Sequence, residues 1–213
     1  MSYILDMCCG TQSIKTAVLA NGFEYVGLDI NSETDKAIPN IVSDIKNWDY
    51  KSYFETNGKP SFIWFSPPCC EYSCLNYARP EKTPDIVGSN KIVKAGLEII
   101  DYCACQYMIE NPQTSKLKNQ DFMTFPYCDI DYCAYGFPYK KRTRLWNNIS
   151  FVGEKCKGKE CPYKENGRHQ YSIGNSTYKT NVREVNTKKS RLGQRYSIPE
   201  PLLNSIIKKV RST

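Results

Sequence analysis

The sequence predicts an α/β fold built on a mostly parallel sheet, and three observations support this. Short apolar runs of strand type alternate with stretches of helical period through the first half of the 213-residue chain. Polar groups follow several of these runs, as expected where parallel strands present ligand-binding residues at their carboxyl ends. The composition is globular, with 40% hydrophobic and 24% charged residues. The length suits one domain with a small appendage.

The expected elements follow one another along the chain. The first five expected strands are 3–7, 25–29, 38–42, 61–65 and 105–109, the last of them ended by Glu110-Asn111-Pro112. Helical spacing covers 14–22 and 84–101. An antiparallel pair, 127–137 and 142–151, is expected around a turn at Pro138, and 197–210 reads as a final amphipathic helix.

Composition also excludes several classes of protein. The longest mostly apolar run, 97–109, has 13 residues and two acids, too few and too polar to cross a bilayer. No secretion signal is recognisable at the start of the sequence. The eleven cysteines are odd in number and include vicinal pairs, which favours reduced thiols in an intracellular, cytoplasm-like compartment, with a nuclear or viral-factory location left open.

The positive charge is concentrated in one segment. The chain carries a net charge of +7, whereas residues 155–195 alone carry +8. A near-neutral body with one basic segment is typical of a polyanion-binding protein. A solvated loop with scattered lysines is the alternative that composition leaves open.

The first polar motif follows the first three expected strands. Gly10 precedes a helical stretch, where glycine lets the backbone approach a ligand and the helix N-terminus offers free N–H groups. Asp29 ends the next strand nineteen residues later, where a carboxylate binds ribose hydroxyls. Asp44 and Ile45 close the third strand and suit the amino group and ring face of adenine. Three such strand ends predict a nucleoside-type cofactor, although a single glycine turn is usually structural.

A thiol and a carboxyl group follow the next two strands. Pro67 and Pro68 stiffen the loop that carries Cys69, so this cysteine is expected to face the cleft rather than pack. Glu110 comes directly after an apolar strand, a position that favours a raised pKa and contact with a ring nitrogen. A buried structural thiol is the alternative for Cys69.

Arg142 and Arg144 lie two residues apart on an expected strand, so both guanidiniums share one face. On an edge strand such arginines are often only solvated. Here they adjoin the other polar elements.

Together these residues resemble the cytosine-C5 methyltransferases, from Tyr3 through the final helix, as a compact member of phage or viral type. The resemblance implies a Rossmann-like S-adenosylmethionine-dependent methyltransferase fold with a small, irregular, basic recognition segment, and S-adenosylhomocysteine as product. The catalytic residues it implies are Cys69 as nucleophile, Glu110 and Asn111 gripping cytosine, and Arg142 and Arg144 contacting the base. The cofactor-binding residues it implies are Asp6, Cys8, Gly10, Thr11, Gln12, Asp29, Ile30, Asp44, Ile45, Ser66, Pro68 and Ser197.

The implied activity is methyl transfer to C5 of cytosine in DNA through a covalent cysteine adduct. An RNA substrate such as tRNA, or a catalytically silent nucleic-acid binder, are the alternatives. A thiol redox or metal-storage protein would explain the cysteines but not the Glu-Asn and arginine elements. No membrane partner is expected.

The sequence departs from the family pattern at several of these positions. Gln12 replaces a glycine and Cys8 an aromatic residue, which alters the methionine side of the cofactor pocket. Cys70 replaces the glutamine after the nucleophile and is therefore a rival nucleophile. The Gly-Asn-Ser element of the last helix is Arg195-Tyr196-Ser197, and Lys140 stands for the glutamine before the arginines.

The expected domain organisation is a catalytic domain of residues 1–150 and 196–213, with a basic target-recognition segment at 151–195. In that segment Cys156, Cys161 and His169 have the loose spacing of three zinc ligands, with no fourth ligand evident. The alternative is a lysine-rich loop with two packed or free thiols, so no metal is required by the sequence.

Overall fold

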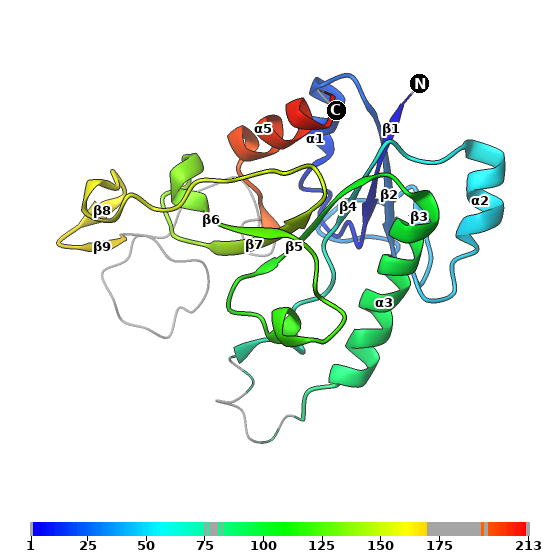
Figure 1. Cartoon of the computed structure of the whole chain (residues 1–213), viewed down its shortest axis with the longest axis horizontal. Coiled ribbons are helices and arrows are strands. Elements are labelled where there is room, and N and C mark those ends of the chain that lie inside the picture. Colours follow the sequence, from blue (N-terminus) through cyan, green and yellow to red (C-terminus); the bar gives the residue numbers. More distant parts are fainter. Residues whose placement is uncertain are drawn as a thin grey trace.

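The computed structural model describes residues 2–74, 76, 81, 83–169, 193 and 196–211. Its centre is a seven-stranded sheet with the strand order β3-β2-β1-β4-β5-β7-β6 (Figure 1). The strands are β1 (Tyr3–Met7), β2 (Glu24–Asp29), β3 (Ile41–Val42), β4 (Phe62–Phe65), β5 (Gln106–Pro112), β6 (Tyr127–Asp131) and β7 (Arg142–Asn147). Strands β1 to β5 are parallel, and β7 runs antiparallel to both β5 and β6. The predicted mostly parallel α/β sheet is confirmed.

Helices cover both faces of this sheet in the part of the chain that the structure describes. They are α1 (Lys15–Ala20), α2 (Tyr50–Asn57), α3 (Ile86–Cys103) and α5 (Glu200–Arg211). Helices α1 and α5 pack with Trp64 and Met108 into one apolar cluster, and α2 and α3 pack with Leu5 and Ile63 into another (Figure 1). Among the described residues, no helix is both long and apolar enough to span a membrane.

Strand order fixes where a ligand can bind. From β1 the chain proceeds outward to β2 and β3 on one side, and then returns to β4 and β5 on the other. In sheets of this kind the crevice outside the carboxyl ends, at the reversal, is where ligands bind. Side chains that follow β1, β2, β4 and β5 therefore gather at one edge.

Among the parallel strands, β3 and β5 depart most from the expected bounds, whereas β2 and β4 each differ by one residue at the start. Strand β5 does not end before Glu110 but continues to Pro112, because antiparallel β7 pairs with it beyond the end of β4. Strand β3 is limited to Ile41–Val42 rather than 38–42, since Pro39 has no N–H for a ladder hydrogen bond.

Helix α2 was not predicted, because its exposed, polar-aromatic sequence lacks an apolar stripe. Asp49 caps it by accepting a hydrogen bond from the backbone N–H of Ser52 at 3.2 Å, and Phe54 is its one buried residue. Such a helix is stabilised by its cap and by aromatic packing against Trp48 and Tyr102.

The predicted antiparallel pair is present as β6 and β7, which are shorter than expected and are connected through the 3₁₀ turn η3 (Tyr132–Tyr135). Beyond them, the described part of the basic segment holds another 3₁₀ turn, η4 (Gly158–Glu160), and a hairpin of β8 (Lys164–Glu165) and β9 (Arg168–His169). Residues 170–192, 194 and 195 of the predicted recognition segment lie outside the described residues.

Candidate active site

A pocket of about 500 Å³ opens at the carboxyl edge of the sheet. Its size lies within the range usual for small-molecule sites. The predicted residues that line it are Asp6, Cys8, Gly10, Thr11, Asp29, Ile30, Asp44, Ile45, Ser66, Pro68, Cys69, Glu110 and Asn111. The nucleoside-type residues and the reactive pair therefore share one cavity.

The glycine turn and the ribose-type acid are joined directly. The backbone N–H of Gly10 donates to Oδ2 of Asp29 at 2.8 Å, and the N–H of Asn31 donates to Oδ1 at 2.9 Å. Gly10 has a φ of +45°, and a Cβ there would meet no atom within 4 Å, so glycine serves the backbone conformation rather than the space. Oδ1 accepts a second hydrogen bond, from Nδ2 of Asn31 at 3.0 Å, whereas Oδ2 keeps lone-pair capacity for a ligand hydroxyl, which fits a ribose.

A second carboxyl group of the pocket, that of Asp6, is buried. It accepts a hydrogen bond from the Tyr25 hydroxyl at 2.8 Å. Burial, with a smaller contribution from the charge of Asp29, raises the pKa of Asp6 to about 8. At neutral pH this group is therefore largely protonated, so that an uncharged carboxyl group lines this part of the pocket.

The thiol of Cys69 also lines the pocket and is not pre-activated. Its pKa is raised by the hydrogen bond with the Cys70 thiol, by burial and by the charge of Glu110, while Lys141 lowers it. The raised pKa keeps the Cys69 thiol protonated at neutral pH.

The carboxyl group of Glu110 stands between two partners. The Tyr132 hydroxyl lies 3.4 Å from Oε1, and Nζ of Lys141 lies 3.9 Å from the same oxygen. The Glu110 side chain is only 12% exposed. The Cys69 and Glu110 side chains thus lie in one partly desolvated pocket.

Sequence comparison agrees with this geometry. Over 177 residues the chain is 33% identical to a Frog virus 3 (isolate Goorha) protein described as a probable DNA (cytosine-5)-methyltransferase, covering 76% of this chain and 78% of the viral protein. The chain belongs to the cytosine-C5 methyltransferase family. It is therefore an S-adenosylmethionine-dependent methyltransferase.

The fold comparison supports the same architecture. The chain resembles a protein described as a DNA modification methyltransferase encoded within an E. coli prophage, with a TM-score of 0.53 and 12% identity. The match covers 69% of this chain but 46% of that one, so the chain spans about half the length of this structural neighbour. The predicted Rossmann-like methyltransferase fold is confirmed. No protein-family model matches the chain.

The structure does not bring the arginines of this methyltransferase into the pocket. Nε and Nη2 of Arg144 donate to the two carboxylate oxygens of Asp129 at 2.7 and 2.9 Å, and its guanidinium lies 3.7 Å from the centre of the Tyr127 ring. Nε of Arg142 donates to Asp131 at 3.2 Å. The two acids of β6 were not considered in the sequence-based prediction. Asp129 and Asp131 pair with the two guanidiniums and keep them beside β6.

Two of the predicted cofactor residues of the methyltransferase also lie outside the pocket lining. The Gln12 amide donates to the Ile38 carbonyl and accepts from Lys15. The Ser197 hydroxyl donates to the Gly193 carbonyl at 2.6 Å. Both side chains are therefore engaged in hydrogen bonds within the protein.

Neighbouring residues line the pocket in their place. Tyr196 and Ile198 flank Ser197 and lie in the lining, and the Ser13 hydroxyl donates to the Tyr196 carbonyl at 2.7 Å. This hydrogen bond connects the segment that precedes α5 to the turn that contains Gly10.

Lys141 is the functional residue that sequence reasoning missed. It precedes β7, between Lys140, which stands at the position of the family's glutamine, and the arginine pair. The alternation of β7 could have identified it, because Lys141 lies on the opposite face to Arg142 and Arg144. It is the cation of the pocket closest to the reactive pair among the described residues.

Three residues named as weak metal candidates do converge. Cys156, Cys161 and His169 lie together, and Cys133 completes the group. Cys133 was missed because it belongs to the catalytic part of the chain, outside the basic segment.

Proposed function

We propose that this methyltransferase acts on C5 of cytosine in DNA and that Cys69 is its nucleophile. The observation that carries the proposal is the presence of Cys69 and Glu110 in the same pocket as Gly10 and Asp29. The viral relative, which is described as acting on DNA, supports the choice of substrate.

The part of the pocket lined by Gly10 and Asp29 would hold S-adenosylmethionine. Asp29 would accept the ribose hydroxyls, and Asp44 with Ile45 would meet the adenine amino group and ring. When bound, this cofactor supplies an electrophilic methyl group on a sulfonium sulfur. The protein's part would be to hold the cofactor and the base together in the pocket that Cys69 and Asp29 line.

The protein's other part is to make C5 of cytosine nucleophilic. The ring carbon is too electron-poor to accept a methyl group unaided, so the Cys69 thiolate adds at C6 and forms a C6–S bond. Glu110 would support this by donating a proton to N3 and accepting a hydrogen bond from the exocyclic amine. After C5 has taken the methyl group, loss of its proton restores the double bond and expels the Cys69 thiolate.

Lys141 suits a role in thiol activation. Its charge is the one that lowers the pKa of Cys69, against the Cys70 thiol, burial and Glu110. A base contact that brought the Lys141 ammonium closer to the thiol would further favour the thiolate.

The basic segment supplies the nucleic-acid contact in this proposal. A cytosine in a duplex must leave the stack to reach the pocket, at a cost of about a few kcal/mol. Residues 155–195, with a net charge of +8, would offset this cost through phosphate contacts.

The test is product analysis after reaction with labelled S-adenosylmethionine. Duplex DNA and transfer RNA are offered separately, and nucleosides are identified by mass spectrometry after digestion. We expect 5-methyldeoxycytidine from DNA, its loss in Cys69→Ser and its retention in Cys74→Ser, an exposed thiol outside the pocket lining. Methylation of RNA alone, or of neither, would overturn the DNA proposal.

A further inference from the structure

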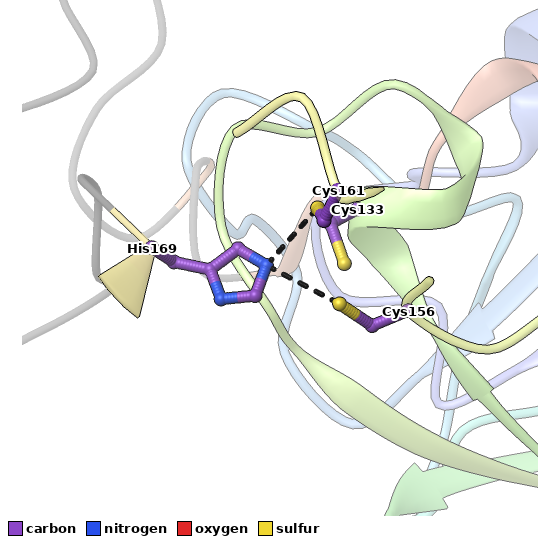
Figure 2. A group of neighbouring side chains, drawn as sticks. All are labelled: Cys133, Cys156, Cys161 and His169. Atoms are coloured by element: carbon purple, nitrogen blue, oxygen red, sulfur yellow. Dashed lines mark hydrogen bonds between the residues drawn. The ribbon is translucent and has the colours of Figure 1, made fainter. Parts of the chain in front are cut away.

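Four ligand atoms from separate parts of the chain meet beside the η3 turn. The thiols of Cys133, Cys156 and Cys161 and a ring nitrogen of His169 all lie within 4.8 Å of one another. Figure 2 shows the imidazole facing the three sulfurs. Cys133 and Cys161 are buried, and the other two residues are half-buried.

The distances match a metal centre better than a hydrogen-bonded cluster. Nε2 of His169 lies 3.6 Å from Sγ of Cys156 and 3.4 Å from Sγ of Cys161 (Figure 2). Tetrahedral zinc, with bonds of about 2.3 Å to sulfur and about 2.0 Å to nitrogen, places such pairs about 3.5 Å apart. One ring nitrogen has a single proton or a single lone pair, so it cannot satisfy two thiols by hydrogen bonding.

The segment that carries three of the ligands has almost no core of its own. Within residues 155–169 the only buried side chain is that of Cys161. Strands β8 and β9 have two residues each, joined by Asn166 and Gly167 with φ of +50° and +78°. An isolated hairpin of this size is not stable in water. A structural metal is one way in which a segment without a core becomes ordered.

The cluster is tied to the active-site end of the sheet through its neighbours. The backbone N–H of Cys156 donates to buried Asp131 at 3.0 Å, and Asp131 also accepts from Arg142. Cys133 directly follows Tyr132, whose hydroxyl contacts Glu110. The ligands therefore join the basic hairpin to the β6–β7 edge (Figure 1).

We propose that Cys133, Cys156, Cys161 and His169 bind a structural Zn²⁺ ion that fixes residues 155–169 to the catalytic domain. Three thiolates and one imidazole form a closed, tetrahedral ligand set, which leaves no position for substrate and suits zinc rather than Mg²⁺ or Ca²⁺. The consequence is that Lys155, Lys157, Lys164 and Arg168 are held in a fixed arrangement for phosphate contacts. Only this consequence rests on the proposed function.

The test is the zinc content of the full chain, measured by mass spectrometry of the metal after extensive dialysis. We expect about one zinc per chain in the wild type and in Cys74→Ser, and loss of zinc in Cys161→Ser and His169→Ala. His169→Cys keeps four ligands and should retain the metal, which separates lost coordination from failure to fold. Replacement of zinc by Co²⁺ should give the thiolate charge-transfer and intense d–d absorption of a tetrahedral site.

Wild-type protein without stoichiometric zinc would overturn the proposal, as would a His169→Ala variant that retains it. So would a disulfide between any two of the three cysteines, found by mass spectrometry without reduction. Metal content is measured without substrate, so this test does not depend on the proposed function. A chain that binds zinc but does not methylate DNA would refute the proposed function and leave the zinc proposal intact.

Discussion

The side-chain amide of Asn111, on β5, donates a hydrogen bond of 2.9 Å to the carbonyl oxygen of Pro67, two residues before Cys69. Asn111 is 1% exposed, and its Oδ1 is buried without a hydrogen-bond partner among the described residues. The contact joins the loop of the thiol to the strand of the carboxyl group. We therefore expect Asn111 to position the Cys69 loop.

Replacing Asn111 by Asp should impair the reaction without impairing cofactor binding. A carboxylate cannot donate to the Pro67 carbonyl, and loss of a buried hydrogen bond costs about 1–3 kcal/mol. We expect methyl transfer to fall by about tenfold or more, while S-adenosylmethionine affinity measured by calorimetry stays close to that of the wild type. Asn57→Asp, on the exposed end of α2, is the control. Equal losses of cofactor affinity and rate would contradict the positioning role.

Asp6 should make the protein less stable as the pH rises. Its pKa in the folded chain, about 8, exceeds the value of 3.8 for a free side chain, so the folded state holds the proton more tightly. Stability from this group is present below about pH 4 and is lost progressively up to about pH 8. We expect Asp6→Asn, which still accepts from Tyr25, to flatten the fall of Tm between pH 5 and 8. Asp101→Asn, exposed on α3, should leave that slope unchanged, and an unaltered slope in Asp6→Asn would refute the account.

The ion pair of Asp129 and Arg144 should act in the opposite direction. The hydrogen bonds from Arg144 lower the pKa of Asp129, although partial burial opposes this. Stability from the pair is present above about pH 4 and is lost as the pH falls through the depressed pKa. Asp129→Asn should lower the free energy of unfolding by about 1–3 kcal/mol at pH 7 and weaken the acid dependence below pH 4. The measurement is urea unfolding at several pH values, with exposed Asp121→Asn as control. The same decrease in stability below pH 4 in Asp129→Asn and in the wild type would contradict a role for the ion pair.

Two substitutions should move the reactivity of Cys69 in opposite directions. Lys141→Met removes the charge that lowers the pKa of the Cys69 thiol, so alkylation at a fixed pH should slow. Cys70→Ala removes the neighbouring thiol that raises this pKa, so alkylation should accelerate. Iodoacetamide rates against pH, with the modified residue located by tandem mass spectrometry, provide the readout, and Lys94→Met on α3 is the control. Shifts in the same direction for both variants would show that other groups set the thiol pKa.

Much of the pocket could be predicted because its residues follow apolar strands. Gly10, Asp29, Cys69 and Glu110 each come at or just after the end of a strand, and a parallel sheet brings such ends to one edge. No knowledge of side-chain packing was needed for this.

What could not be predicted depends on partners distant in the chain. The position of the Arg144 guanidinium is set by its hydrogen bonds to Asp129, which lies fifteen residues earlier in the chain. The metal cluster depends on Cys133, which lies twenty-three residues before Cys156. Strand period gives the face of a side chain but not the acid or thiol it meets there. The continuation of β5 through Pro112 likewise depends on β7, which the local sequence does not reveal.

The central claim is that the sulfur of Cys69 forms a bond to the base, and one measurement tests it directly. Duplex DNA containing 5-fluorocytosine is incubated with the protein and S-adenosylmethionine, because fluorine at C5 leaves no proton to lose and the C6–S bond then persists. The denatured complex is digested, and the nucleotide-bearing residue is located by tandem mass spectrometry. The account predicts a nucleotide on Cys69 that is absent in Cys69→Ser and present in Cys70→Ser. A nucleotide on Cys70, or no covalent complex at all, would contradict it.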